Sequence, residues 1–289
     1  MFEKVFFPID LSEVSITCAR AMRELRKYGA NEIKIFHALE YEPDSLVEGG
    51  VDVEKFISKL KSKIEEKLYE ISEELSRDFS VSFEVFPTVN PVTEILKRSE
   101  NYDLMLIPSR SKSSLLVGKT AEKVIRNVKI PCLVIKAREN AGRSYYEQIL
   151  RNIFEKPVLI LEQLKFDPKV VERFLNFGTK EIKLIHVADL DNVLEEKVSK
   201  EEIIHPLVPI PKLAEILSDY WKRAREELEK FRHYFTIKGV NASVYVGFGS
   251  IEKCLEVLSK SEGFSVAFCE KQNFEKVLKV SDAVFVGSL

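Results

Sequence analysis

The feature of this sequence that most limits its fold is an internal repeat. The segments Glu32–Glu40 (EIKIFHALE) and Glu181–Asp189 (EIKLIHVAD) are near copies of each other and lie about half the chain apart. Each copy follows a short apolar segment, Lys4–Ile9 in the first half and Val158–Leu161 in the second. A repeat of this length is far too long for a solenoid, so the chain is predicted to hold two tandem domains.

Each half alternates short apolar runs with long segments of helical periodicity. Apolar residues three and four positions apart predict long helices over residues 53–75 and 213–235. Continuous runs such as Leu104–Ile107 and Cys132–Ile135 are typical of buried parallel strands. The alternation predicts βαβ units. The expected fold class is therefore α/β, with two tandem doubly wound domains, each a five-stranded parallel sheet, related by a pseudo-twofold axis.

The length of the chain, 289 residues, suits two domains that each bury their own core. Residues 139–146 (ENAGRSYY) are polar, contain a glycine and interrupt the pattern, which is typical of a linker. We expect a first domain over residues 1–138, a linker over 139–152 and a second domain over 153–289.

Composition limits the partners and the location. Lysine and arginine number 44 against 46 acidic residues, which argues against nucleic-acid binding and against a polybasic membrane binder. No apolar run reaches the ~18–20 residues that span a bilayer, and the amino terminus runs directly into a strand, so no signal peptide is expected. The four cysteines lie in apolar patterns without CxxC spacing, as buried, reduced thiols do. These features predict a cytoplasmic protein.

Two motifs, in this order along the chain, resemble the universal stress protein family. Residues 7–13 (FPIDLSE) close the first predicted strand, and residues 118–124 (GKTAEKV) follow the fourth. A histidine after the second strand, His37, and the segment 131–135 (PCLVI) complete the pattern. Both halves look like members, so the resemblance covers nearly the whole chain, in a tandem form.

The resemblance implies an adenine nucleotide alpha hydrolase-like fold, with domains that pair through their last strands. It also implies an ATP or AMP ligand at the carboxyl ends of the strands, the usual ligand position in open α/β sheets. The expected function is a regulatory stress-response role without enzymatic activity, with an adenine nucleotide bound in the first half only and no required cofactor. The two domains are expected to pair within the chain, and a homodimer is left open.

The family's phosphate loop reads Gly-x-x-Gly, nine residues, then Gly-Ser/Thr, and its backbone amides wrap the phosphates. In this chain Pro108 and Ser111 stand at the first two glycines, the spacer has six residues, and Lys119 replaces the hydroxyl residue. Only Gly118 remains. Residues 109–120 (SRSKSSLLVGKT) instead hold three positive charges and no acid. Such a loop can hold a phosphate through its side chains; a solvated surface loop is the equal alternative.

The candidate nucleotide-binding residues come from the family pattern (Pro8, Asp10, Ala38 and Gly118) and from charge and position (Ser111 and Lys119). No HExxH, GxSxG or Cys–His nucleophile arrangement occurs, so no catalytic residue and no metal site are expected. The histidines at the ends of the repeated strands are expected to be structural.

The second half has lost more of the family pattern. Its closing interval, from Cys269 to Asp282, spans 13 positions, whereas the corresponding interval in the first half spans 24. The missing residues are the phosphate loop and part of its helix. In the sequence alignment Gln163 takes the place of Asp10, and Leu161 takes the place of Pro8. We therefore expect no nucleotide site in the second half.

The second half is expected to act as a packing partner. Its closing strand, Ala283–Val286, is apolar on both faces, and a bare edge strand invites pairing. Pairing with Cys132–Ile135 would cover both edges within one molecule. Two other functions are weighed: an interaction or structural protein with no nucleotide binding, and a nucleotide-hydrolysing or nucleotidyl-transferring enzyme. The enzyme would need a glycine-rich phosphate loop and acidic metal ligands, and neither is visible.

Overall fold

The structure is a computed structural model that describes residues 2–42, 52–109, 118–138, 140–190, 193 and 210–287. It divides into two compact units. Unit 1 consists of Met1–Asn152 together with Asp282–Ser288, and unit 2 is essentially Ile153–Ser281. Unit 2 is therefore an insertion between two parts of unit 1, and each unit is described by itself.

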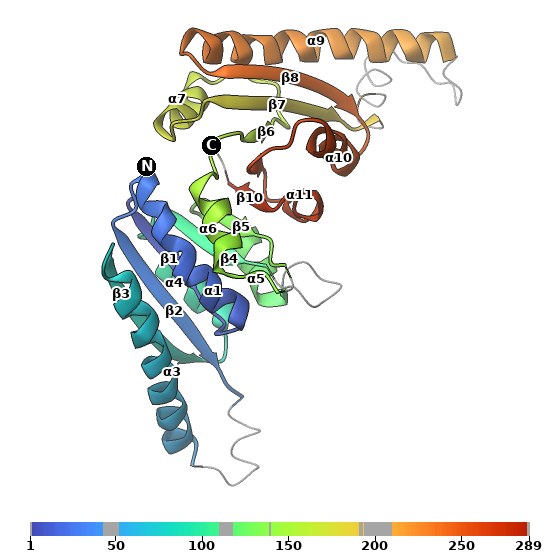
Figure 1. Cartoon of the computed structure of the whole chain (residues 1–289). Helices are drawn as coiled ribbons and strands as arrows, with labels where there is room; N and C mark the ends of the chain where they lie inside the picture. Colours follow the sequence, from blue (N-terminus) through green and yellow to red (C-terminus); the bar gives the residue numbers. More distant parts are fainter. Residues whose placement is uncertain are drawn as a thin grey trace. The chain divides into compact units, whose positions relative to one another are not determined.

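Unit 1 is built on a doubly wound sheet (Figure 1). Its strand order is β3-β2-β1-β4-β5-β10, and every pairing is parallel except that of β10 with β5, which is antiparallel. The strands are β1 (Lys4–Pro8), β2 (Glu32–Glu40), β3 (Ser80–Thr88), β4 (Leu104–Pro108), β5 (Cys132–Ile135) and β10 (Ala283–Val286).

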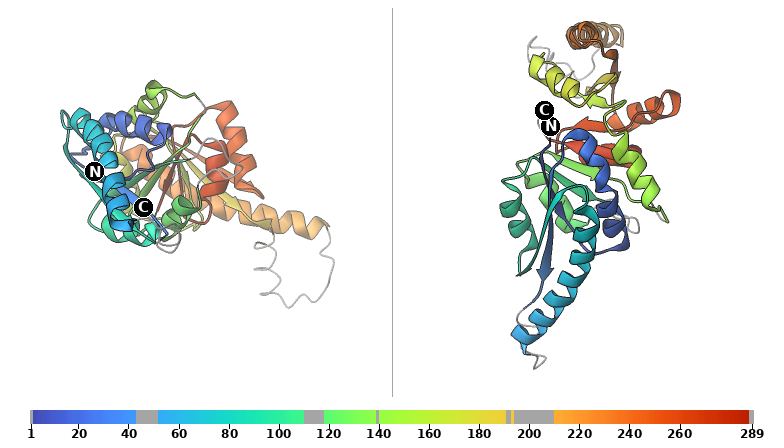
Figure 2. Two further views of the ribbon diagram at one scale, coloured as in Figure 1. Left: turned by 90° about the horizontal axis from the view of Figure 1, so that it is seen from below. Right: turned by 60° about the vertical axis from the view of Figure 1, so that its left-hand side comes forward.

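Helices cover both faces of the unit 1 sheet (Figure 2). Helix α1 contacts α3 and α6, whereas α4 contacts α5. Side chains satisfy the first amides of three of these helices: Asp52 accepts from Lys55 N, Ser12 from Ser15 N and Asn90 from Thr93 N. The helices are α1 (Glu13–Ala21), the 3-10 helix η1 (Met22–Tyr28), α3 (Val53–Leu75), α4 (Pro91–Ser99), α5 (Lys119–Asn127) and α6 (Arg143–Arg151).

Helix α6 occupies the predicted linker, 139–152, and the structure places it in unit 1. Tyr146 and Leu150, four positions apart, are fully buried and form its apolar face. At its end, the Arg151 guanidinium donates to both carboxylate oxygens of Glu24 at 3.0 Å, and the Arg151 carbonyl accepts from the Tyr28 hydroxyl at 2.6 Å. The segment is therefore a packed helix of the first unit and not a linker.

Unit 2 holds a smaller sheet of the same kind. Its strand order is β9-β6-β7-β8, and all pairings are parallel. Helix α7 contacts α9, and α10 contacts α11. Its elements are β6 (Val158–Ile160), α7 (Pro168–Asn176), β7 (Glu181–Ala188), α9 (Ile210–Ile237), β8 (Asn241–Phe248), α10 (Ile251–Ser261), β9 (Ala267–Cys269) and α11 (Phe274–Val280).

The predicted α/β class is confirmed, and so is the pairing of the closing strand. Ala283 lies opposite Ile135, and Val286 lies opposite Cys132. β10, the predicted fifth strand of the second half, thus lies next to β5, the fifth strand of the first half. The pseudo-twofold relation of the two halves stays a prediction. No helix in the described part of the chain is long and apolar enough to cross a membrane.

Candidate functional site

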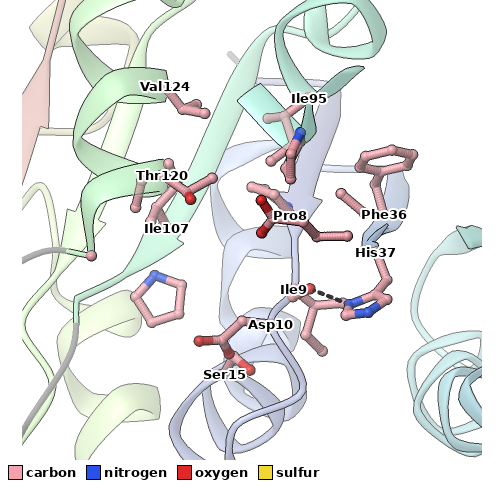
Figure 3. A pocket seen from close by; sticks show the side chains of 16 residues that line it. Pro8, Ile9, Asp10, Ser15, Phe36, His37, Ile95, Ile107, Thr120 and Val124 are labelled. Carbon is pink, nitrogen blue, oxygen red and sulfur yellow. Dashed lines mark hydrogen bonds between the residues drawn. The ribbon is translucent and has the colours of Figure 1, made fainter. Parts of the chain in front are cut away.

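A pocket of about 220 Å³ opens at the carboxyl ends of β1, β2 and β4, beside the start of α5. Figure 3 shows side chains from all of these elements converging on it. Its walls are largely apolar and its polar groups are few, as in most small-molecule sites. It is lined by Pro8, Ile9, Asp10, Ser15, Phe36, His37, Ala38, Glu40, Pro91, Ile95, Ile107, Pro108, Gly118, Thr120, Ala121 and Val124.

The turn after β1 places Asp10 at the pocket. Leu11 has a φ of 60°, in the left-handed region that a leucine rarely adopts. This turn lets the Asp10 carboxylate accept hydrogen bonds from Ser12 N at 3.0 Å and Ser12 Oγ at 2.6 Å. Ser12 in turn caps α1. The motif at residues 8–12 thus combines a strained turn, a helix cap and a carboxylate held at the mouth of the pocket.

His37 forms part of the wall next to Asp10. Its Nδ1–H donates to the Ile9 carbonyl at 2.8 Å (Figure 3). Burial lowers the pKa of His37 below its usual value of 6.5, although the bond to Ile9 and the charge of Asp10 act in the opposite direction. The ring is therefore neutral near pH 7 and ties the end of β2 to the turn after β1.

The lowered pKa of His37 predicts how stability depends on pH. Because the unfolded ring takes up a proton first, the contribution of His37 is present above about pH 6.5 and is lost as the pH falls toward the folded pKa. In His37→Asn the carboxamide can still donate to Ile9, but it does not titrate. We expect urea midpoints measured at about pH 7.5 and 5.5 to differ less in His37→Asn than in the wild type. An equal difference in both proteins would contradict this assignment.

Helix α5 begins at the pocket without a side-chain cap. Gly118 is its N-cap residue, and its carbonyl accepts from Glu122 N at 2.9 Å. The first-turn amides of α5 therefore have no side-chain acceptor among the described residues. Thr120 of this turn lines the pocket (Figure 3). A helix start of this kind favours a negatively charged group.

The candidate residues divide into three groups. Pro8, Asp10, Ala38 and Gly118 line the same pocket although they come from separate parts of the sequence. Lys119 lies in the first turn of α5 but is not among the lining residues. Ser111 lies outside the described residues.

The described residues at the end of β4 offer few hydrogen-bond donors to a phosphate. Pro108 has no amide hydrogen. The Ser109 amide donates to Ile135 O at 2.8 Å, and the Ser109 hydroxyl accepts from Ala137 N at 2.8 Å. Ser109 is only 3% exposed. The Ser109 amide is therefore used by β5, and its hydroxyl oxygen holds the segment that follows β5.

Glu40 is a lining residue that sequence reasoning missed, whereas Thr120 lies in the segment 109–120 that was predicted to hold a phosphate. Glu40 ends the repeated strand, two positions after Ala38, and Thr120 stands two positions after Gly118. Among the lining residues of this pocket there are two carboxylates, Asp10 and Glu40, and neither lysine nor arginine. The described walls therefore supply acceptors, and the donors come from the start of α5.

A family model described as the Universal stress protein family matches residues 1–136. The match places this domain, residues 1–136, in the universal stress protein family. No curated protein matches the chain.

Three solved structures are similar to this chain. A universal stress protein from Archaeoglobus fulgidus is 19% identical, with a TM-score of 0.67, over 99% of this chain and 96% of that one. The cytoplasmic domain of a prokaryotic cation chloride cotransporter is 9% identical, with a TM-score of 0.50, over 99% and 95%. A hypothetical protein is 33% identical, with a TM-score of 0.40, over 49% and 100%. The likeness to the Archaeoglobus fulgidus protein covers both halves of this chain, and it shows a shared fold.

Unit 2 has a counterpart of the pocket in unit 1. His186 Nδ1 donates to the Leu161 carbonyl at 2.7 Å, as His37 does to Ile9. A hollow of about 770 Å³ lies beside it, lined among others by Glu162, His186 and Asn273. As with His37, burial lowers the pKa of His186.

The strand register corrects the sequence alignment of the two halves by one position. Ile160 pairs with Ile185, immediately before His186, just as Pro8 pairs with Phe36, immediately before His37. Ile160 and not Leu161 therefore takes the place of Pro8. By the same step, Glu162 and not Gln163 takes the place of Asp10. Unit 2 has kept a carboxylate at this position.

Proposed function

We propose that this chain is a regulatory stress-response protein that binds an adenine nucleotide, ATP or AMP, in unit 1 and catalyses no reaction. The observation that carries the proposal is the convergence of four family-pattern residues on one pocket: Pro8, Asp10, Ala38 and Gly118. Membership of residues 1–136 in the universal stress protein family supports the stress-response role. A homodimer and a cytoplasmic location stay predictions.

The geometry suits the parts of a nucleotide. Ile95, Ile107 and Val124 give apolar walls against which a flat base can pack (Figure 3). The carboxylates of Asp10 and Glu40 are acceptors for sugar hydroxyls. The first-turn amides of α5 are donors for a phosphate. The proposal includes no required cofactor and no catalysis.

A second candidate function is an interaction protein that has lost nucleotide binding. The exit from β4 favours it, because Pro108 lacks an amide hydrogen and the Ser109 amide is bonded to Ile135. In the family these positions begin the phosphate loop. A ligand that depends on several backbone amides would bind weakly here.

Thermal-shift and calorimetric titrations with AMP and ATP separate the two functions. A ligand that binds only the native state, at a hundred times its Kd, adds about 2.7 kcal/mol to the free energy of unfolding. We expect both nucleotides to raise the melting temperature of the wild type. Asp10→Ala should weaken binding about tenfold, through the loss of a charge-assisted hydrogen bond.

Glu13→Ala is the matched control, because Glu13 is an exposed acid three positions further on that does not line the pocket. It should bind nucleotide like the wild type. If neither nucleotide shifts the melting temperature, the interaction protein becomes the better reading. Equal affinity in Asp10→Ala and the wild type would remove Asp10 from the site.

A further inference from the structure

The carboxylate of Glu162 in unit 2 makes hydrogen bonds outside its own turn. Asp10 is held by its own turn, through Ser12 N and Ser12 Oγ. In unit 2 the position of Ser12 is taken by Leu164, which has no hydroxyl. Glu162 is one methylene longer than aspartate and reaches instead to the segment that follows β9.

Two carboxamides bind Glu162 there, one to each oxygen. Gln272 Nε2 donates to Oε2, and Asn273 Nδ2 donates to Oε1. Both residues belong to the short connection between β9 and α11. By connectivity and register this connection is the counterpart of the loop between β4 and α5, because β9 pairs with β6 as β4 pairs with β1. In the family that loop holds the phosphates.

Charge around Glu162 also disfavours an anion. Burial, followed by the charge and hydrogen bond of Glu162, raises the pKa of the nearby Glu270 carboxyl. Asp189 and Glu252 line the same hollow, and Lys276 is the one lysine or arginine among its described lining residues. The donors that could serve a phosphate are therefore used by a carboxylate of the chain itself, in a surrounding that is already negative.

We propose that Glu162 is a built-in anion that fills the phosphate position of unit 2 and thereby closes that unit to phosphorylated ligands. Glu162 is then a specificity-determining residue, because its bonds to Gln272 and Asn273 use the donors that a phosphate in unit 2 would need. The shortened connection after β9 brings Gln272 and Asn273 within reach of Glu162, so the deletion and the carboxylate act together.

The test is a titration of the full chain with inorganic phosphate, followed by NMR at the backbone amides of Gly249 and Asn273. Glu162→Ala removes the carboxylate and frees both carboxamides and Lys276 for an anion. We expect phosphate to shift these resonances in Glu162→Ala with an affinity at least about tenfold higher than in the wild type. Glu162→Gln, which keeps the size but not the charge, should lie between them.

Glu226→Ala is the matched control, because Glu226 is an exposed acid on α9 that does not line the hollow. It should behave like the wild type. Phosphate binding at these amides in the wild type would overturn the proposal, and so would a folded Glu162→Ala without a gain in affinity. If Glu162→Ala does not fold, the result with Glu162→Gln decides in the same way. The probe carries no adenine and the readout lies in unit 2, so the outcome does not depend on nucleotide binding in unit 1.

Discussion

A chain that ends at Ser281 is expected to aggregate, or to melt far below the full-length protein. The truncation removes β10, whose four side chains are at most 2% exposed and whose backbone forms an antiparallel ladder with β5. It also removes Asp282, which accepts two hydrogen bonds of 2.7 Å from Arg138. Without β10 the apolar strand β5 becomes a bare edge that can pair with another chain.

A point substitution tests the same contact with less disruption. Phe285 is 2% exposed and its ring lies 5.6 Å from that of Phe2. Phe285→Ala should lower the free energy of unfolding by about 3–5 kcal/mol, measured by urea denaturation. Val257→Ala, at a valine that is 60% exposed on α10, should change it by less than about 0.5 kcal/mol. If the chain that ends at Ser281 stays monomeric and has the melting temperature of the full-length protein, β10 does not stabilise the fold.

The pairing of β10 with β5 was predictable because two independent signals agreed. The apolar pattern of Ala283–Val286 indicated a strand buried on both faces, and its position near the end of the chain left it without an obvious neighbour. The residues of the pocket in unit 1 could be predicted from the sequence for a similar reason. Pro8, Asp10, Ala38 and Gly118 lie where parallel strands end, and such ends meet at one edge of a sheet.

The sequence did not predict helix α6, because the segment is rich in polar residues and its apolar face is short. Residues 139–146 read as a linker, yet Tyr146 and Leu150 are buried on one side of a helix of nine residues. A helix of two or three turns presents only two such positions, which is too few for periodicity to reveal. Tertiary contact with α1 and η1 decides this segment.

The one-position error in the alignment of the halves had a different cause. A strand of only three residues, such as Val158–Ile160, is too short to fix the alignment of the two halves by its sequence alone. The bond from His186 to the Leu161 carbonyl fixes it in the structure. Because the alignment was wrong by one position, Glu162 was not recognised as the counterpart of Asp10. Its bonds to Gln272 and Asn273 depend on side-chain geometry, which a sequence pattern does not show.

The second large effect is expected at Arg98, which packs against Phe36 in the wall of the pocket. Its guanidinium lies over two rings, 4.8 Å from the centroid of Phe36 and 4.1 Å from that of Phe86. Its Nε donates to Glu84 at 2.8 Å, and its Nη1 donates to Glu94. Phe36 lines the pocket. Arg98→Ala should therefore lower the free energy of unfolding by about 2 kcal/mol, because two partly desolvated cation–π contacts and the bond to Glu84 are lost together.

Arg98→Lys separates the shape of the side chain from its charge. Lysine keeps the positive charge but has no planar group to stack on Phe36 and Phe86, so it should recover less than half of the loss. Lys97→Ala is the control, because Lys97 is exposed on the same helix turn, and it should change the free energy of unfolding by less than about 0.5 kcal/mol. If Arg98→Lys has the free energy of unfolding of the wild type, the positive charge alone accounts for the stabilisation by Arg98. A change of less than about 0.5 kcal/mol in Arg98→Ala would mean that Phe36 is positioned by the sheet without the arginine.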